Sequence, residues 1–316
     1  MKSFRIIENP SELGAGTRGS SLGIEALRIA AINKKSKLFY DNEVVTLTKN
    51  NKKLFKNIDT PHAIRLKQVY NRIKVLGEEV ANSLLERSFP LVISGDHSSA
   101  AGTIAGLKKA YPKNRIGVIW IDAHSDMHTP YTTPSGNVHG MPLAMAMGLD
   151  NKKMARNEVV DNTLDYWEKC KNLFDINPKM NPEDLVFIGL RSSEIEEVSL
   201  MDEYDVKKIL VNEVREIGTN QTVKEALTYL SNCDSIYISL DVDSMDPDLT
   251  SYGTGTPVKG GLSPQEVTEI VANLLKDERI KVLELCEINP LLDNKNRMAE
   301  ISLVILEDII HIINKE

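Results

Sequence analysis

Short runs of β-branched and aliphatic residues alternate along this chain with longer stretches whose apolar residues recur at helical spacing. The eight apolar runs are SFRII (3–7), EVVTL (43–47), PLVIS (90–94), RIGVIWID (115–122), LVFIGL (185–190), KILVN (208–212), SIYISLDV (235–242) and KVLELCEI (281–288). The helical stretches are 62–87, 98–110, 221–231, 264–277 and 299–314. This rhythm is typical of parallel strands joined by crossover helices, so it predicts an α/β fold with eight strands.

The chain shows no internal repeat, no low-complexity tract and no linker rich in Pro, Gly or Ser. We therefore predict that residues 1–316 form a single domain, a size that can bury a large core. The polar stretch 149–184 interrupts the alternation, and we expect it to be an excursion with a helix around NTLDYWEKCKNLF. Pro264 after Ser263 predicts a helix start.

Composition excludes several classes of function. The formal net charge is -7 and no run of Lys and Arg occurs, which argues against a nucleic-acid partner because phosphate binding needs a concentrated basic surface. No stretch approaches the roughly 20 apolar residues that cross a bilayer, and MKSFRIIENP is too short in its apolar part for a signal peptide. We expect a cytoplasmic protein without a membrane partner. Its cysteines, Cys170, Cys233 and Cys286, lack metal-knuckle spacing and are expected to be reduced, partly buried thiols.

Carboxylates and imidazoles follow four of the predicted strands. In chain order they are Asp96 and His97, then Asp122, His124, Asp126 and His128, then Asp241, Asp243 and Asp246, and finally Glu287. Because sites in open parallel sheets form beyond the carboxyl ends of the strands, we expect these side chains to converge.

The spacing within these motifs indicates divalent metal ions. In DAHSD the first, third and fifth residues point to one side of an extended segment, with about 6.6 Å between successive members. The two aspartates of DVD have the same alternate spacing. A lone Asp or His would be a cap or a structural residue, but four of the six histidines lie between positions 97 and 139. Several carboxylates in one place repel one another unless cations compensate them. Carboxylate oxygen and imidazole nitrogen suit Mn, Zn or Fe, and bridging carboxylates suggest two ions.

One motif points elsewhere. GAGTRG (14–19) fits the glycine fingerprint of dinucleotide sites, but ENPSEL separates it from the preceding strand, and the next helix begins only around Leu22. The tight strand-turn-helix that seats a pyrophosphate is therefore missing. We expect a flexible loop that borders the mouth of the active site.

The motifs SGDHS, DAHSD, SGNVHGMPLA, SLDVDSMDP, GTGTPVKGGLS and CEINPLLDNKNRMAE resemble those of the ureohydrolase family, from about Gly14 to the C-terminus. Within the family, TTPSGNVHG and EINPLLD resemble the arginase branch more narrowly. The resemblance implies a three-layer α/β/α fold with an eight-stranded parallel sheet, two Mn²⁺ per chain, and a homo-oligomer, either a trimer or a hexamer.

The resemblance also implies roles for individual residues. His97, Asp122, Asp126 and Asp241 would hold one ion, and Asp122, His124, Asp241 and Asp243 the other, with Asp122 and Asp241 bridging. Asp126 would pass a proton to the leaving nitrogen and His139 would relay protons to solvent. Glu287 would pair with a guanidinium group and Thr256 would line the same pocket. Thr133, Ser135 and Asn137 would bind the substrate carboxylate, although TTPSGN taken alone is only a polar turn.

Two positions depart from the arginase pattern. His128 stands where arginases have an asparagine near the α-carboxylate, and IGLRSSEIEE offers Ser192 and Glu194 where they have two aspartates, one of them near the α-amino group. We expect both His128 and Glu194 to contact substrate. The sequence thus predicts a manganese-dependent C–N hydrolase of a guanidino amino acid, converting L-arginine and water to L-ornithine and urea. Alternatives are a formiminoglutamase, an agmatinase, another guanidino-acid hydrolase, or a non-catalytic relative.

Overall fold

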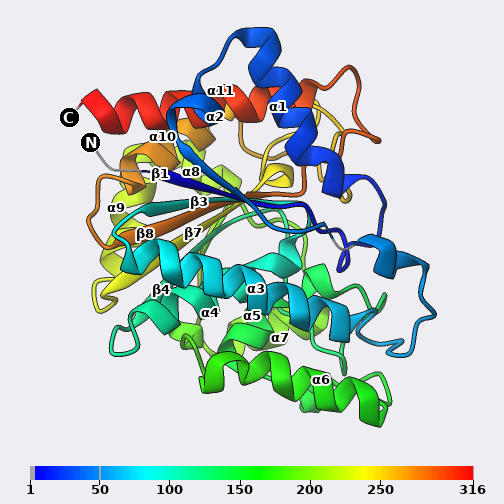
Figure 1. Cartoon of the computed structure of the whole chain (residues 1–316). Coiled ribbons are helices and arrows are strands. Elements are labelled where there is room, and N and C mark those ends of the chain that lie inside the picture. Colours follow the sequence, from blue (N-terminus) through cyan, green and yellow to red (C-terminus); the bar gives the residue numbers. More distant parts are fainter. Residues whose placement is uncertain (1–3, 50, 316) are drawn as a thin grey trace.

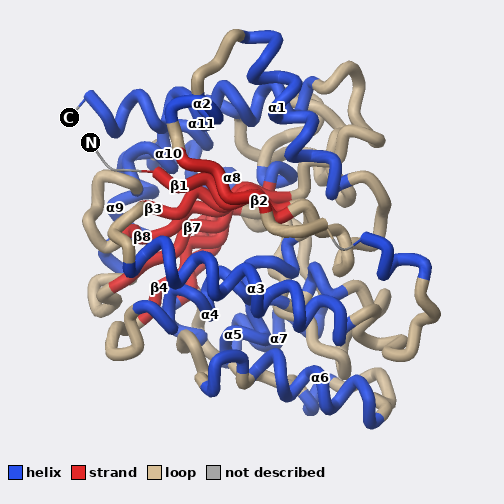
Figure 2. The backbone as a smooth tube through the Cα atoms, viewed as in Figure 1, coloured by secondary structure: helices blue, strands red, loops and turns tan. Residues whose placement is uncertain are grey.

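A parallel sheet forms the centre of the computed structural model, which describes residues 4–49 and 51–315. Its eight strands follow the order β2-β1-β3-β8-β7-β4-β5-β6, and all neighbouring strands run parallel (Figures 1 and 2). The strands are β1 (Phe4–Asn9), β2 (Glu43–Thr46), β3 (Phe89–Ser94), β4 (Ile116–Ile121), β5 (Leu185–Ile188), β6 (Lys207–Ile209), β7 (Ser235–Asp241) and β8 (Ile280–Cys286).

The predicted eight-stranded parallel sheet is confirmed, because each of the eight apolar runs overlaps one of these strands. The first run begins at Ser3, which lies outside the described residues. In the central strands β3, β4 and β7 every residue is buried, which explains why they read as continuous apolar runs rather than as alternating patterns.

Helices cover both faces of the sheet and make the predicted three-layer fold. They are α1 (Gly23–Lys34), α2 (Leu38–Asp41), α3 (Leu66–Leu85), α4 (Ala100–Ala110), α5 (Pro142–Met147), α6 (Asp161–Lys171), α7 (Ile195–Glu203), α8 (Val211–Ile217), α9 (Thr219–Tyr229), α10 (Pro264–Leu274) and α11 (Arg297–Lys315). One core cluster joins α1, α8, α9, α10 and α11 to the sheet, and α3, α4, α5 and α7 pack on the opposite face (Figure 1).

All five predicted helical stretches are confirmed, and the excursion 149–184 contains α6 as expected. The short helices α7 and α8 were not predicted, because nine and seven residues are too few to show a clear helical period. No helix within the described ranges is long and apolar enough to span a bilayer.

Close packing of α3 against α4 places the segment that carries His97. A Cβ atom at Gly102 would lie 2.5 Å from the carbonyl oxygen of Ile73, and one at Gly106 would lie 2.5 Å from that of Gly77. Only glycine permits this approach of two backbones. Helix α4 is directly preceded by the short 3₁₀ turn η3 (His97–Ser99), so the packing of α4 positions His97 above the end of β3.

Candidate metal centre and active site

The strand order explains where the candidate site lies. Strands β3, β8, β7 and β4 are neighbours in the middle of the sheet, so their carboxyl ends lie side by side. His97 follows β3, Glu287 follows β8, Asp241 ends β7 and Asp122 follows β4. Residues separated by up to 190 positions therefore meet at one edge of the sheet.

The first acidic group surrounds His97. Its Nδ1 atom lies 3.0 Å from Asp122 Oδ2, 3.0 Å from Asp126 Oδ2 and 3.1 Å from Asp241 Oδ2. These are the four residues predicted to hold one ion, and the structure brings their ligand atoms together.

A second group lies beside it and shares Asp122. His124 Nδ1 lies 3.5 Å from Asp122 Oδ1 and 3.1 Å from Asp243 Oδ2. Asp122 thus presents one oxygen to each group, as a bridging ligand would. Asp241 Oδ1 accepts a hydrogen bond from the Asp243 backbone N–H at 2.8 Å, and its Oδ2 faces His97 in the first group. Asp246 stays outside both groups and accepts hydrogen bonds from the N–H groups of residues 248 and 260.

The donor atoms fit metal ions. His97 Nδ1 and Asp122 Oδ2 are buried and have no hydrogen-bond partner among the described residues. His97 is held in place by stacking on Trp120, with ring centroids 4.0 Å apart, and by a 2.6 Å contact between its Nε2 and Ser239 Oγ. If Nε2–H donates to this hydroxyl, the Nδ1 lone pair points into the acidic group, as in other metal-binding histidines.

The charges of the group also favour cations. Burial raises the pKa of Asp126 to about 6, and the Asp122 carboxylate adds to the shift. Burial likewise raises the pKa of Asp241 well above its usual range, with Asp243 and Asp122 contributing. Asp122 is the exception, because the nearby imidazoles of His124 and His97 outweigh its burial and lower its pKa. Divalent cations would stabilise the charged form of both carboxylates and offset their mutual repulsion.

A cavity of about 150 Å³ opens above this cluster. Every predicted site residue except Asp122, which lies beneath the cavity, contributes to its wall: His97, His124, Asp126, His128, Thr133, Ser135, Asn137, His139, Glu194, Asp241, Asp243, Thr256 and Glu287. Thr256 also donates a hydrogen bond to Asp243 Oδ2 at 3.1 Å, so it orients a predicted ligand.

Glu287 lies on the inner side of the cavity. Its Oε1 atom accepts a hydrogen bond from the His97 backbone N–H at 3.0 Å and lies 3.1 Å from His139 Nδ1. The other oxygen, Oε2, accepts no hydrogen bond from the described residues. Burial opposes charge on His139, but the hydrogen bond with Glu287 outweighs it and raises the pKa of His139 to about 9. The same bond lowers the pKa of Glu287 despite its burial.

The loop that follows the DAHSD motif presents hydroxyl groups on the outer side. Thr133 Oγ1 accepts a hydrogen bond from the N–H of Gly136 at 2.9 Å, and Ser135 Oγ accepts one from the N–H of Asn137 at 3.1 Å. Since each oxygen already accepts a bond, the O–H hydrogens remain as donors toward the cavity.

An acidic pair lies on the same outer side. His128 Nε2 lies 3.5 Å from Glu194 Oε2 and 3.6 Å from Glu197 Oε2. Sequence reasoning missed Glu197. This residue is buried, and its side chain accepts a hydrogen bond from the N–H of Met127 at 3.0 Å. It also forms a capping box with Glu194 at the start of α7. The spacing E-x-x-E directly after a strand end is the signal that would have found it.

The GAGTRG segment is a loop beside cavity-lining residues, as predicted, but hydrogen bonds hold its first residue in place, which a flexible loop would not show. The Gly14 N–H donates to Asp96 Oδ2 at 3.0 Å, and the Gly14 carbonyl accepts from the His139 N–H at 3.1 Å. A Cβ at Gly16 would lie 2.5 Å from the side chain of Asn137. Asp96 therefore fixes this loop and does not join the metal cluster.

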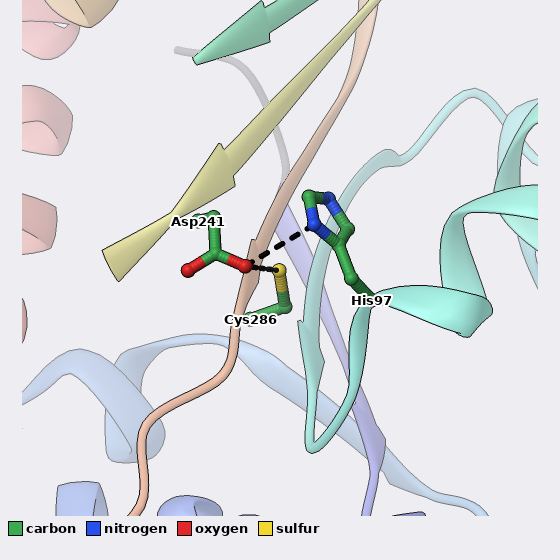
Figure 3. Close-up of side chains that lie close together, drawn as sticks. All are labelled: His97, Asp241 and Cys286. Carbon is green, nitrogen blue, oxygen red and sulfur yellow. Dashed lines mark hydrogen bonds and ion pairs between the residues drawn. The ribbon is translucent and has the colours of Figure 1, made fainter. Parts of the chain in front are cut away.

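The cysteines are all free and all fully buried rather than partly so. Cys286 differs from the other two because its sulfur lies in the first acidic group, near His97 and Asp241 (Figure 3). The sequence analysis did not predict that Cys286 contacts His97 and Asp241, although Cys286 directly precedes Glu287.

The chain resembles known proteins over nearly its whole length. A model of the arginase family matches residues 2–311. The chain is 35% identical over 311 residues to the arginase of Bacillus subtilis, a match that covers 98% of both chains. The native structure of the arginase from Bacillus caldovelox superposes with a TM-score of 0.82 at 34% identity, over 98% of both chains. An Entamoeba histolytica arginase in complex with L-ornithine gives a TM-score of 0.82 at 25% identity, over 98% of this chain and 99% of that one.

Proposed function

Because the chain belongs to the arginase family of hydrolases, we propose that it hydrolyses the guanidinium group of L-arginine to give L-ornithine and urea. The observation that carries the proposal is the lining of one cavity. It combines the histidine and aspartate cluster and Glu287 with hydroxyl donors and two neighbouring glutamates. This pattern matches a substrate with a guanidinium group at one end and an amino acid at the other.

We propose two Mn²⁺ per chain at the inner end. His97, Asp122, Asp126 and Asp241 would hold one ion, and Asp122, His124, Asp241 and Asp243 the other. Bound divalent cations supply Lewis-acid activation of water near neutral pH. The buried, unpartnered Nδ1 of His97 and Oδ2 of Asp122 support this assignment.

Glu287 would orient the guanidinium group. Its Oε1 is already engaged by His97 and His139, whereas Oε2 remains available for an N–H of the substrate. A charge-assisted contact of this kind is both stronger and more directional than a neutral one.

Asp126 and His139 would handle protons. Asp126 lines the cavity, and its carboxylate is suited to accept a proton from the attacking water and to give it to the leaving nitrogen. The His139 side chain is 20% exposed, so it can exchange protons between the cavity and solvent.

The outer end would bind the amino acid group. The O–H donors of Thr133 and Ser135, with the Asn137 amide, suit a carboxylate, and Glu194 suits an α-ammonium group. We predict that His128 contacts the carboxylate, so His128→Ala should raise KM for arginine more than it lowers kcat. Steady-state kinetics check this, and an unchanged KM would contradict the assignment.

The test of the function is kcat/KM on Mn-loaded protein for L-arginine, agmatine, 4-guanidinobutyrate and formiminoglutamate. We expect a higher kcat/KM for arginine than for agmatine, which lacks the carboxylate. With agmatine bound, the polar groups that recognise the carboxylate would stay unpaired, and binding would be weaker. Agmatine equal to or better than arginine would refute carboxylate recognition. Formiminoglutamate turned over better than arginine would indicate a formiminoglutamase, and no turnover of any compound would indicate a non-catalytic relative.

We further propose that the protein assembles into a homo-oligomer, a trimer or a hexamer as the family resemblance implies. Sedimentation velocity of the purified chain measures this directly, and a monomer at micromolar concentration would contradict it.

A further inference from the structure

A thiol lies at the edge of the candidate metal centre. Cys286 ends β8 and is in register with Asp241 at the end of β7, so the two side chains stand next to each other on the same face of the sheet. Figure 3 shows the Cys286 sulfur pointing at the Asp241 carboxylate, and the distance from Sγ to Oδ2 is 3.5 Å. The side chain is fully buried.

The sulfur shares its surroundings with an unpartnered nitrogen. The ligand atoms of His97, Asp241 and Cys286 all lie within 4.8 Å of one another. His97 is 1% exposed, and its Nδ1 has no hydrogen-bond partner among the described residues. The thiol is not committed elsewhere either, because its other contact, with the Leu240 carbonyl oxygen, is 3.8 Å long and therefore weak.

These separations fit donors on one ion. Metal–nitrogen and metal–sulfur bonds are about 2.1 and 2.3 Å long, so donors on opposite sides of an ion lie about 4.4 Å apart. The distance of 3.5 Å between Cys286 Sγ and Asp241 Oδ2 is shorter than this maximum, so both atoms can bind the same ion.

We propose that Cys286 is a thiolate ligand of the ion held by His97 and Asp241, and that it shifts the metal preference of this position from Mn²⁺ toward Co²⁺ or Zn²⁺. The inference rests on the metal centre of the proposed function. Binding forms a metal–sulfur bond and releases the S–H proton to solvent. Thiolate is a soft donor, and soft donors favour cobalt and zinc, whereas an all-oxygen and imidazole set suits manganese well.

The first test is the absorption spectrum of the metal-free protein titrated with Co²⁺. We expect a thiolate-to-cobalt charge-transfer band in the near ultraviolet that saturates with bound metal and is absent from Cys286→Ser. Cys233→Ser is the matched control, because Cys233 is also buried but its Sγ contacts Asp184, outside the cluster. This variant should keep the band.

The second test is competition between Mn²⁺ and Zn²⁺, read by elemental analysis after dialysis. We expect Cys286→Ser to lower the zinc-to-manganese preference by roughly tenfold or more, within the range seen when a metal's surroundings are altered. Cys233→Ser should leave the preference unchanged. Thermal unfolding of the metal-free variants verifies that both are folded.

The outcomes separate this inference from the function. Bound cobalt without a charge-transfer band, or a band that persists in Cys286→Ser, overturns the thiolate ligand even if arginine is hydrolysed. A band without hydrolysis of any guanidino substrate overturns the function and leaves the ligand standing. Failure of the wild-type chain to bind cobalt overturns the ligand together with the metal centre.

Discussion

At the residue scale, the two oxygens of Glu287 are used differently. Oε1 accepts the His97 backbone N–H and contacts His139, and the backbone of Glu287 has a positive φ of 68°. A non-glycine residue in this conformation costs free energy that the surrounding contacts must offset, a pattern common at functional sites. The strained backbone and the hydrogen bonds together hold Oε2 ready for a cationic ligand.

Glu287→Gln tests this arrangement with little change in shape. The amide oxygen can still accept the His97 N–H, but the negative charge is lost. We expect kcat/KM for arginine to fall by about ten- to a hundredfold, the worth of a hydrogen bond to a charged group. Metal content by elemental analysis should stay as in the wild type. An unchanged kcat/KM would mean that the guanidinium group binds elsewhere.

At the element scale, the start of α7 serves the helix and the cavity together. Glu194 is the N-cap residue, and the Glu197 side chain accepts its backbone N–H at 3.0 Å, while the same two carboxylates face His128. Helix α10 has an equivalent capping box built from Ser263 and Glu266, which lies outside the cavity lining.

Comparing the two caps separates stability from binding. Ser263→Ala should lower the free energy of unfolding by about 1 kcal/mol, the usual cost of losing an N-cap, and leave KM for arginine unchanged. Glu197→Ala should cost roughly 1–3 kcal/mol, because it also leaves the Met127 N–H unpaired, and should raise KM. Urea unfolding and steady-state kinetics measure both. Equal KM values in the two variants would remove Glu197 from the binding site.

The end of α6 gives a pH-dependent prediction. Lys179 is fully buried, and its Nζ donates to the carbonyl oxygens of Cys170 and Lys171 at 3.2 and 2.5 Å. Burial lowers its pKa to about 8, below the value near 10.4 of an unfolded lysine. Between these values the unfolded chain binds the extra proton, so stability rises with pH in this window and the penalty is complete below pH 8.

Lys179→Met isolates this effect. The free energy of unfolding of the wild type minus that of the variant should increase by about 1 kcal/mol per pH unit between pH 8.5 and 10. Urea unfolding at pH 7, 8.5 and 10 provides the values, and other titrating groups cancel in the difference. A difference that is flat with pH would show that Lys179 stays charged in the folded protein.

At the scale of the whole molecule, the candidate metal centre ties together the ends of four central strands. Its donors come from the ends of β3, β4, β7 and β8, so ions bound there would cross-link segments distant in the sequence. Glu284 makes a second link within the sheet, because its carboxylate accepts hydrogen bonds from Ser94, Thr103 and Tyr237.

Removal of metal should therefore destabilise the folded state. A ligand that binds only the folded protein at a hundred times its Kd adds about 2.7 kcal/mol, so chelation should lower Tm and added Mn²⁺ should restore it in a concentration-dependent way. Asp122→Asn, which removes the shared carboxylate charge, should abolish the response. Calorimetry gives Tm, and a single transition would also support one domain over residues 1–316. A Tm indifferent to chelator would contradict the metal centre.

The sequence by itself determined the layers and the ligand types. The signals it used are local: the apolar runs of the strands, the helical spacing and the alternate carboxylates of DAHSD. Local signals can be recognised without knowledge of the fold. They predicted the eight strands, the convergence of carboxylates at strand ends, and the polar turn beside them. The family motifs added His139 and the role of Glu287, and no local pattern encodes the pairing of these two residues across 148 positions.

The tertiary structure alone decided which distant residues touch. Strand order places β8 between β3 and β7, and this order brings Cys286 to Asp241 and the backbone of His97 to Glu287. It also turns His128 toward Glu197 and fixes the loop around Gly14 on Asp96. The physical reason is that strand order is set by the packing of helices on both faces of the sheet, a sum of many weak contacts that no short stretch of sequence contains.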